Sequence, residues 1–356
     1  MVYSNDLSVS SISRDAVRHN MADNFETEML KQRRQLYTTV FSQSFSPCGR
    51  FVAVCDNFGR ITLFSLAASL SADAKEDSRK PVFTFQAHNG PVYTLSSTER
   101  FLISAGTGDI KAWSWADILK KSPKVQWSLS PPFNHSFDNP ETNSVVITKD
   151  GMLCSGCGDN NVYLWDMQSG TCTNTLKGHT DYIHALTLRG NDQQVVSAGE
   201  DGAVRIWDLR DSREAVHVLE PYKHDVCARP EQGRWIGCVA VDSGDDWLVC
   251  GGGPSLSLWH MRSMTPVVAF STPNSSQNVV MFQEDQIMSA GSSPCVNHWS
   301  MNGELRSQVP CTPPCIYSMA INTNSASYKV LSAAGSSAKV DIFTNFGYKA
   351  FSMLVC

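Results

Sequence analysis

Four residues whose types could support chemistry lie in one stretch of the sequence, LKGHTDYIHALTLRGNDQQVVSAGEDGAVRIWDLR. They are His179, Ser197, Asp201 and Trp207. A histidine with polar and acidic neighbours could act in catalysis or bind a metal ion. The same side chains could instead form a buried chain of hydrogen bonds that satisfies the polar groups inside a sheet. The choice depends on the elements that position these residues.

The twelve cysteines are a second group with possible chemistry, and they show no repeating bridge pattern. The first twenty residues lack an apolar segment and a small-residue cleavage site, so no secretory signal is predicted and free thiols are expected. Cys154 and Cys157 form a CxxC, but no second pair stands at zinc spacing. We interpret these two as buried packing residues, with metal or redox chemistry as the alternative.

Familiar catalytic motifs are missing from the sequence. It contains no GxSxG elbow, no GxxxxGK[ST] loop, no HExxH and no GxGxxG between a strand and a helix. The glycine run at 251–253 leads from one predicted strand to another, so it lacks the helix N-terminus of a phosphate-binding loop. We therefore expect no catalysis, no cofactor, no metal and no small-molecule substrate.

The composition excludes further classes of partner. The chain has 356 residues, 29 Lys and Arg against 34 Asp and Glu, and a formal net charge of −5. This balance argues against a protein that binds phosphate backbones, and the basic pairs at 33–34, 79–80 and 120–121 are short. We expect RNA contacts to be at most indirect. No apolar run approaches the ~18 residues of a membrane span, so no membrane partner is expected.

An internal repeat organises the chain. A short alternating strand ends in an aromatic residue seven times, at intervals of 49, 52, 42, 52, 40 and 44 residues. Small-residue strand ends such as SAG and SAGED precede most of these aromatics, and two of the seven carry a Trp-Asp dipeptide. A period of about 40–45 residues with four short strands is typical of WD40 propeller blades. The prediction is an all-β, seven-bladed WD40 propeller over residues 37–356.

The first and last repeat units each read as four strands in chain order. Packing of blade seven against blade one should therefore close the ring, without a swapped N-terminal strand. Residues 67–80 interrupt the first blade as a predicted short helix and loop, and residues 220–234 form a long polar connection. Long loops on a rigid ring often carry recognition, and a solvated connector is the alternative.

The segment before the ring divides into two parts. Residues 1–22 are rich in Ser and Asn and lack apolar periodicity, so disorder is predicted. Residues 23–36 read as a short N-terminal helix, with acidic residues in the first turn and basic residues in the last. Phe25, Met29 and Leu36 fall on one face, which we expect to pack on the ring or on a partner.

Several segments closely resemble the THO complex subunit 6 family, among them FSQSFSPCGRFVAV, GRWIGCVAVDS, WLVCGGGPSLSLWH and TNFGYKAF. The resemblance covers about residue 37 to the C-terminus. It implies a non-enzymatic subunit of the THO part of the nuclear TREX assembly, which couples transcription and processing to mRNA export. Implied partners are the other THO subunits, especially the coiled-coil subunits 5 and 7, and the implied location is the nucleus, with nuclear speckles as one site to test.

The WD40 pattern also implies roles for individual residues. In WD40 blades Trp donates to Ser, Ser to His and His to Asp, which favours a structural role for His179. Binding residues on such rings often precede the first inner strand residue or the aspartate of this network, and the matching positions are Asn89, Thr180, Tyr182 and Glu200. Tyr182 is the leading candidate, because an exposed tyrosine supplies area and a hydrogen bond at low entropy cost.

One other function remains open at this point. A WD40 adaptor of another complex, such as a ubiquitin-ligase substrate receptor, would share the fold. That role usually places an Asp-Arg pair after the Trp-Asp dipeptide, whereas this chain reads WDMQ and WDLR.

Overall fold

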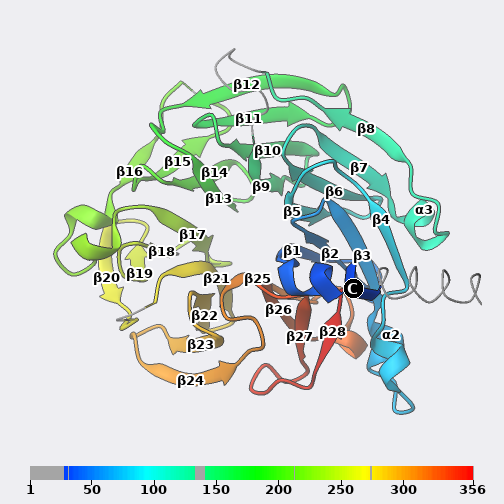
Figure 1. Ribbon diagram of the computed structural model, residues 1–356. Helices are drawn as coiled ribbons and strands as arrows, with labels where there is room; N and C mark the ends of the chain where they lie inside the picture. The colour runs from blue at the N-terminus through cyan, green and yellow to red at the C-terminus, as the bar shows by residue number, and fades with distance from the viewer. Residues whose placement is uncertain (1–27, 31, 133–140, 212, 273–274, 356) are drawn as a thin grey trace, which may run out of the picture.

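The computed structural model describes residues 28–30, 32–132, 141–211, 213–272 and 275–355. They form seven four-stranded antiparallel sheets arranged as blades around a central axis (Figure 1). The seven-bladed propeller predicted from the repeat is confirmed. Among the described residues, no helix has the length and apolarity needed to cross a membrane.

Each blade takes four consecutive strands, running in order from the centre to the rim. Blades 1 and 2 are β1 (Val40–Phe45), β2 (Phe51–Asp56), β3 (Arg60–Ser65), β4 (Phe83–Gln86), then β5 (Val92–Ser97), β6 (Phe101–Gly106), β7 (Ile110–Ser114), β8 (Val125–Leu129). Blades 3 and 4 are β9 (Thr142–Ile147), β10 (Met152–Cys157), β11 (Asn161–Asp166), β12 (Thr171–Lys177), then β13 (Ile183–Arg189), β14 (Gln194–Gly199), β15 (Val204–Asp208), β16 (His217–Leu219).

The remaining three blades follow the same order. Blade 5 is β17 (Ile236–Val241), β18 (Trp247–Gly252), β19 (Ser257–His260), β20 (Thr265–Ala269). Blade 6 is β21 (Gln277–Gln283), β22 (Gln286–Gly291), β23 (Cys295–Ser300), β24 (Leu305–Pro310). Blade 7 is β25 (Ile316–Ile321), β26 (Leu331–Gly335), β27 (Lys339–Phe343), β28 (Phe351–Leu354).

The small residues that end the second strand of most blades have a steric cause. At Gly291, a Cβ would stand 1.8 Å from the carbonyl oxygen of Ser276, just before the inner strand of blade 6. At Gly335, a Cβ would stand 1.8 Å from the carbonyl oxygen of Cys315 in the same relation. At these two positions the chain entering the inner strand therefore passes too close for a side chain.

The apolar core is divided into seven clusters, each shared by two neighbouring blades. The cluster between blades 4 and 5, for example, joins Val196 and Ile206 to Leu248 and Trp259. A single blade cannot bury both faces of its sheet alone, so each blade depends on both neighbours for stability.

Blades 7 and 1 close the ring through the same apolar packing and through hydrogen bonds between the two blades. Val52, Phe64, Val340 and Ile342 belong to one buried cluster. Gln43 Nε2 donates to the carbonyl oxygens of Ser318 and Ser332, each at 3.1 Å. The first and last blades each take their strands in chain order, and no described residue before Val40 pairs with β28. The prediction of closure without a strand swap is confirmed for the part of the chain described here.

The two predicted insertions both lie on the ring. The short helix and loop expected at 67–80 are present as α2 (Leu66–Ser69), which begins one residue earlier, and the 3₁₀ turn η1 (Glu76–Arg79). Residues 220–234 contain the 3₁₀ turns η2 (Pro221–Lys223) and η3 (Pro230–Gln232). Arg229 fixes this connection, because its guanidinium donates to five carbonyl oxygens, among them Thr272 at 2.7 Å and Gly253 at 2.8 Å. Arg229 thus ties the connection to the ring, and a recognition role for this segment stays a prediction.

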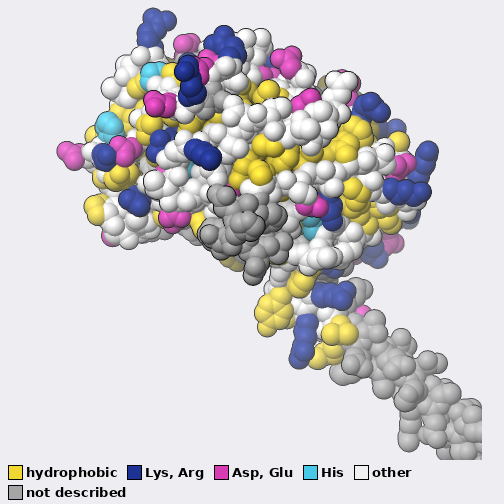
Figure 2. Space-filling view, turned by 90° about the horizontal axis from the view of Figure 1, so that it is seen from above, with side chains coloured by type: hydrophobic (Ala, Val, Ile, Leu, Met, Phe, Trp, Pro, Cys, Tyr) yellow, Lys and Arg dark blue, Asp and Glu magenta, His cyan; other side chains and the backbone are white. Residues whose placement is uncertain are grey.

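Two further short helical elements and the N-terminal helix complete the described structure. α3 (Trp115–Leu119) follows β7, and η4 (Ala326–Tyr328) precedes β26. The described part of the N-terminal helix covers residues 28–30 and 32–37, and it projects from the ring (Figure 2). At its base, Gln32, Gln35 and Leu36 line one cavity together with residues of blade 7. Met29 and Leu36 are 40% and 80% exposed, so the ring leaves most of the Leu36 side chain and part of Met29 uncovered. Phe25, and residues 1–22 with their predicted disorder, lie outside the described residues.

Candidate functional site

The mouth of the central channel is built from one position that recurs in every blade. In all seven inner strands the pairing with the next strand skips the second residue, which forms a β-bulge. A bulged residue leaves the ladder and its side chain is re-aimed. The seven bulged residues line one cavity of about 500 Å³, and they are Phe41, Tyr93, Asn143, His184, Gly237, Asn278 and Tyr317.

Aromatic side chains form one half of this mouth. The ring of Phe41 in blade 1 lies between Tyr93 of blade 2 and Tyr317 of blade 7, with centroid distances of 5.3 and 5.7 Å. The Tyr93 hydroxyl donates to Glu141 Oε1 at 3.2 Å. Burial and the neighbouring Glu141 carboxylate raise the pKa of Tyr93, so the phenol stays a neutral donor.

The opposite side of the mouth is organised by Trp235 and Gly237. Gly237 has no side chain to present, and the indole of Trp235 occupies that space, where a Cβ on Gly237 would stand 2.7 Å from the ring. The indole reaches toward His184 of blade 4, with the two ring centroids 6.5 Å apart. His184 Nε2 lies 2.7 Å from Glu200 Oε2, which places a carboxylate and an imidazole side by side at the edge of the cavity.

The binding candidates taken from the sequence lie on this same face, because they precede inner strands or line the cavity. Glu200 is one of the cavity residues, and its backbone N–H donates to the carbonyl of Tyr182 at 2.7 Å. Tyr182 is 38% exposed, and its ring lies against Gly158 of blade 3. Thr180 and Asn89 are exposed just before β13 and β5. Met29 lies apart from them on the N-terminal helix.

The four residues His179, Ser197, Asp201 and Trp207 form a connected chain inside blade 4. Trp207 Nε1 donates to Ser197 Oγ at 2.9 Å, and Ser197 Oγ lies 2.7 Å from His179 Nε2. His179 Nδ1 lies 3.0 Å from both carboxylate oxygens of Asp201. All four are buried, so every step of the chain is shielded from water.

Asp201 is the anchor of this chain. It also accepts the backbone N–H groups of Ala203 at 3.0 Å and Thr180 at 3.1 Å. Burial acts to raise the pKa of Asp201, but the hydrogen bond and charge of His179 and the two N–H donors outweigh burial and lower it. The carboxylate therefore ties the exposed Thr180 segment to the interior of the blade, and this arrangement favours a structural role for His179.

Other blades contain shorter versions of this chain. In blade 2, Trp113 donates to Ser104, whose Oγ lies 2.8 Å from His88 Nε2. The pKa of His88 is lowered to about 4 by burial and by the charge of Lys111, so its ring is neutral at pH 7. Trp-to-Ser bonds recur in blades 3, 5 and 6, formed by Trp165 and Ser155, Trp259 and Ser257, and Trp299 and Ser289.

The CxxC pair lies inside blade 3 with no metal-binding arrangement around it. Burial raises the pKa of Cys154 and of Cys157 to about 12, which keeps both thiols protonated and unreactive. No group of three or more His, Cys, Asp or Glu that could hold a metal ion occurs in the described part of the chain. The geometry supports the packing interpretation of these cysteines.

The chain is similar to known proteins over most of its length. The family model for the WD domain, G-beta repeat, matches residues 79–114, 128–166 and 170–208. Human THO complex subunit 6 is 51% identical over 331 residues, which cover 92% of this chain and 96% of the human protein. The chain belongs to the THO complex subunit 6 family. Members of this family from Danio rerio and Drosophila melanogaster are 49% and 30% identical, each over 89% of this chain and over 98% and 89% of their own lengths.

Sequence reasoning missed most of the channel mouth, although one segment pointed there. Phe41, Tyr93, Trp235 and Tyr317 were not among the predicted binding residues. Trp235 and Gly237 belong to RWIGC, a segment on which the resemblance to the THO complex subunit 6 family rests. Aligning the seven repeats on the first buried residue of each inner strand would have placed the bulged residues in one column.

Proposed function

We propose that this protein is a non-enzymatic scaffold subunit of the THO/TREX assembly in the nucleus, where it supports the coupling of transcription and processing to mRNA export. The observation that carries the proposal is the match to THO complex subunit 6 over nearly the whole chain. The proposed partners are other THO subunits, especially the coiled-coil subunits 5 and 7.

The channel mouth supports this function as a binding surface. Seven bulged positions hold its side chains on the inner strands of a rigid ring, so a partner would meet a surface that needs little ordering. Aromatic residues such as Phe41, Tyr93, Trp235 and Tyr317 supply contact area of the kind that dominates protein interfaces. We assign this face, with Tyr182 and Glu200 at its edge, to the contact with a THO subunit.

The N-terminal helix offers a second contact suited to a coiled coil. Four apolar side chains of the helix are exposed to between 40% and 80%: Met29, Leu30, Leu36 and Tyr37, at 40%, 52%, 80% and 71%. Exposed apolar residues in such number mark interaction sites more often than isolated surface residues do. We assign these residues to a helical partner.

Direct RNA binding is not part of the proposal. The basic pairs at 33–34, 79–80 and 120–121 lie on the N-terminal helix, on the blade 1 insertion and after α3, so each belongs to a separate element. Lys80 is already paired with Asp77, with Nζ 2.6 Å from Oδ1. Strong phosphate binding needs clustered cations, and these pairs do not form one cluster along the chain.

The proposal is tested by affinity purification of the full chain from nuclear extract, followed by mass spectrometry with and without nuclease. THO coiled-coil subunits should be recovered in near-equal amounts and survive nuclease treatment. Recovery of a ubiquitin-ligase adaptor in their place would favour the alternative adaptor function. Loss of the THO subunits after RNA digestion would contradict a direct scaffold role.

A further inference from the structure

A second cavity lies on the face of the ring opposite the channel mouth. Its volume is about 690 Å³, and it lies between blades 5 and 6. The inner strands β17 and β21 carry Gly237 and Asn278 at their starts, on the channel mouth, whereas Val241 and Phe282 line this cavity near their ends. A partner in this cavity would therefore leave the channel mouth free.

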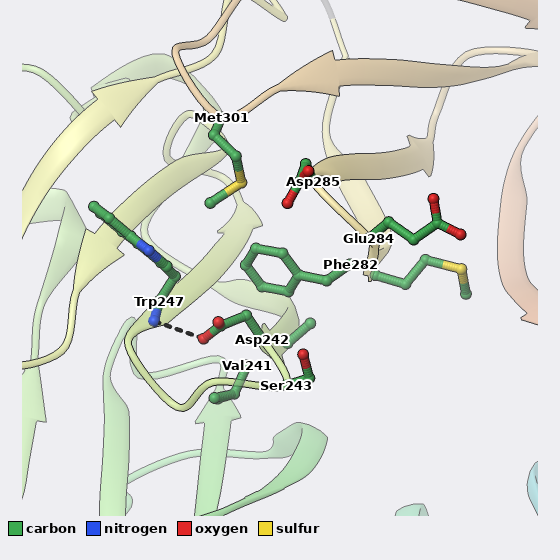
Figure 3. A pocket seen from close by; sticks show the side chains of 10 residues that line it. Val241, Asp242, Ser243, Trp247, Phe282, Glu284, Asp285 and Met301 are labelled. Carbon is green, nitrogen blue, oxygen red and sulfur yellow. Dashed lines mark hydrogen bonds between the residues drawn. The ribbon is translucent and has the colours of Figure 1, made fainter.

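Aromatic and thioether side chains form the walls. Trp247 comes from the start of β18, Phe282 from the end of β21 and Met301 from the turn after β23. Figure 3 shows the indole, the phenyl ring and the thioether facing one another across the cavity. The faces of Trp and Phe attract cations through their quadrupoles, most strongly where water is partly excluded.

Carboxylates lie next to these walls. The cavity is lined by Asp242, Glu284 and Asp285, and none of its lining residues is Lys, Arg or His. In Figure 3, the carboxylates of Asp242 and Asp285 stand on either side of the Phe282 ring, whereas that of Glu284 points away from it. The cavity thus combines aromatic faces with negative charge, and no cationic side chain lines it.

The two inner carboxylates differ in how they are held. Asp242 is fixed, because its Oδ1 accepts the Trp247 backbone N–H at 2.7 Å and its Oδ2 accepts that of Gly244 at 3.0 Å. Asp285 has no hydrogen-bond or ion-pair partner among the residues that the structure describes. Glu284 lies at the rim, with its Oε1 3.9 Å from Lys329 Nζ. Asp285 is therefore the carboxylate with the most free acceptor capacity.

We propose that this cavity binds an arginine or lysine side chain from a basic segment of a protein partner. The cation would lie against Trp247 and Phe282 while its N–H groups donate to Asp285 and Asp242. Nucleic acid fits poorly, because its phosphates would meet three carboxylates. A purely apolar segment also fits poorly, because it would remove water from those charges without pairing them. The proposal is independent of the proposed function, since it concerns a different face of the ring.

The experiment uses the full chain labelled with ¹³C at the methionine methyl groups, because Met281 and Met301 line the cavity. Substitution of each by Leu assigns its resonance. The probes are the peptide acetyl-Ser-Gly-Arg-Gly-Ser-amide and the same peptide with Lys or with uncharged citrulline in the centre. The Arg or Lys peptide should shift the Met281 and Met301 signals in a salt-dependent manner, whereas the citrulline peptide should not. Equal shifts with citrulline, or no shift by ~10 mM peptide, would overturn the proposal.

Variants separate the charge from the walls. Asp285→Asn combined with Glu284→Gln removes charge with little change in shape, and we expect it to weaken binding of the charged peptide by about tenfold. Glu99→Gln, at an exposed site in blade 2, is the matched control and should leave binding unchanged. Trp247→Leu should weaken binding while keeping the wall apolar. Undiminished binding in the Asp285 and Glu284 double variant would show that Asp285 does not recognise the cation, which would overturn the proposal.

Discussion

The indole of Trp235 fills the space that Gly237, two residues further along the chain, leaves free because it has no side chain. In the other six blades the bulged residue presents its own side chain to the channel mouth, whereas in blade 5 a neighbour supplies an aromatic ring. This relationship places a large aromatic surface beside His184 and Glu200.

Gly237→Ala should alter the channel mouth without unfolding the ring. The new Cβ would stand 2.7 Å from Trp235 Cζ3, the far end of a movable side chain, so the indole should be displaced at a cost of about 1 kcal/mol. Intrinsic fluorescence should change while the thermal midpoint shifts by only a few degrees.

Gly291→Ala provides the contrasting case. Its Cβ would stand 1.8 Å from the carbonyl oxygen of Ser276, which is backbone and cannot move aside. The expected loss exceeds about 3 kcal/mol, measured by denaturant unfolding. Equal losses for the two substitutions would contradict the different roles given to these glycines.

Asp201→Ala should destabilise the protein by about 1–3 kcal/mol, because it leaves His179 and the Ala203 backbone N–H buried without an acceptor and removes the acceptor of the Thr180 N–H. Ser197→Ala should cost a similar amount, and the double substitution should cost less than the sum because both belong to one network. Thermal melts test this, with the exposed Asp150→Ala as control. If the two losses of stability add fully, Asp201 and Ser197 do not belong to one coupled hydrogen-bond network.

His88 should make stability fall between about pH 6.5 and pH 4. Its folded pKa of about 4 lies below its ordinary value of 6.5, so in this range the unfolded chain binds a proton that the folded chain does not. The contribution of neutral His88 to the free energy of unfolding is then fully present above pH 6.5. It declines on acidification, by up to about 3 kcal/mol at pH 4. His88→Gln should flatten this slope in denaturant titrations, whereas the exposed His217→Gln should leave it unchanged.

Asn322→Ala tests how the ring closes. Asn322 is fully buried, and its Nδ2 donates to the carbonyl of Gly49 in blade 1 at 2.7 Å and to that of Tyr328 in blade 7 at 2.8 Å. Its loss should cost about 1–3 kcal/mol, because the buried carbonyl oxygen of Gly49 and the partly buried one of Tyr328 lose their donor. Amide hydrogen exchange should rise first in β1 and β26. An equal rise in blade 4 would contradict a local role of Asn322 in holding blades 7 and 1 together.

The sequence predicts the architecture well because the repeat carries it. Alternating strands, an aromatic at each strand end and small residues such as Gly291 reflect local requirements of each blade, and these are visible in one unit at a time. The chain of His179, Ser197, Asp201 and Trp207 was predictable for the same reason. Closure without a swap followed from counting strands in the first and last units.

The channel mouth was harder to predict, since it depends on register rather than on composition. A β-bulge depends on how two strands pair. The sequence of the inner strand alone therefore does not show where the side chain of Phe41 or Tyr93 points. Trp235 reaches the mouth only because a glycine stands two residues later. The sequence does not decide whether the apolar face of the N-terminal helix packs on the ring or on a partner. In the structure, the ring leaves most of Leu36 and part of Met29 uncovered.

The most direct test of the central claim is pull-down of purified THO subunits 5 and 7 by the full chain carrying Trp235→Ala and Tyr182→Ala. Both side chains lie on the channel face, and Trp235 lines the cavity, so the account predicts at least a tenfold loss of binding with an unchanged thermal midpoint. Leu305→Ala, a partly exposed residue on the rim strand β24, is the matched control and should bind normally. Full recovery of subunits 5 and 7 with the double variant would contradict the assignment of the channel mouth as the binding surface.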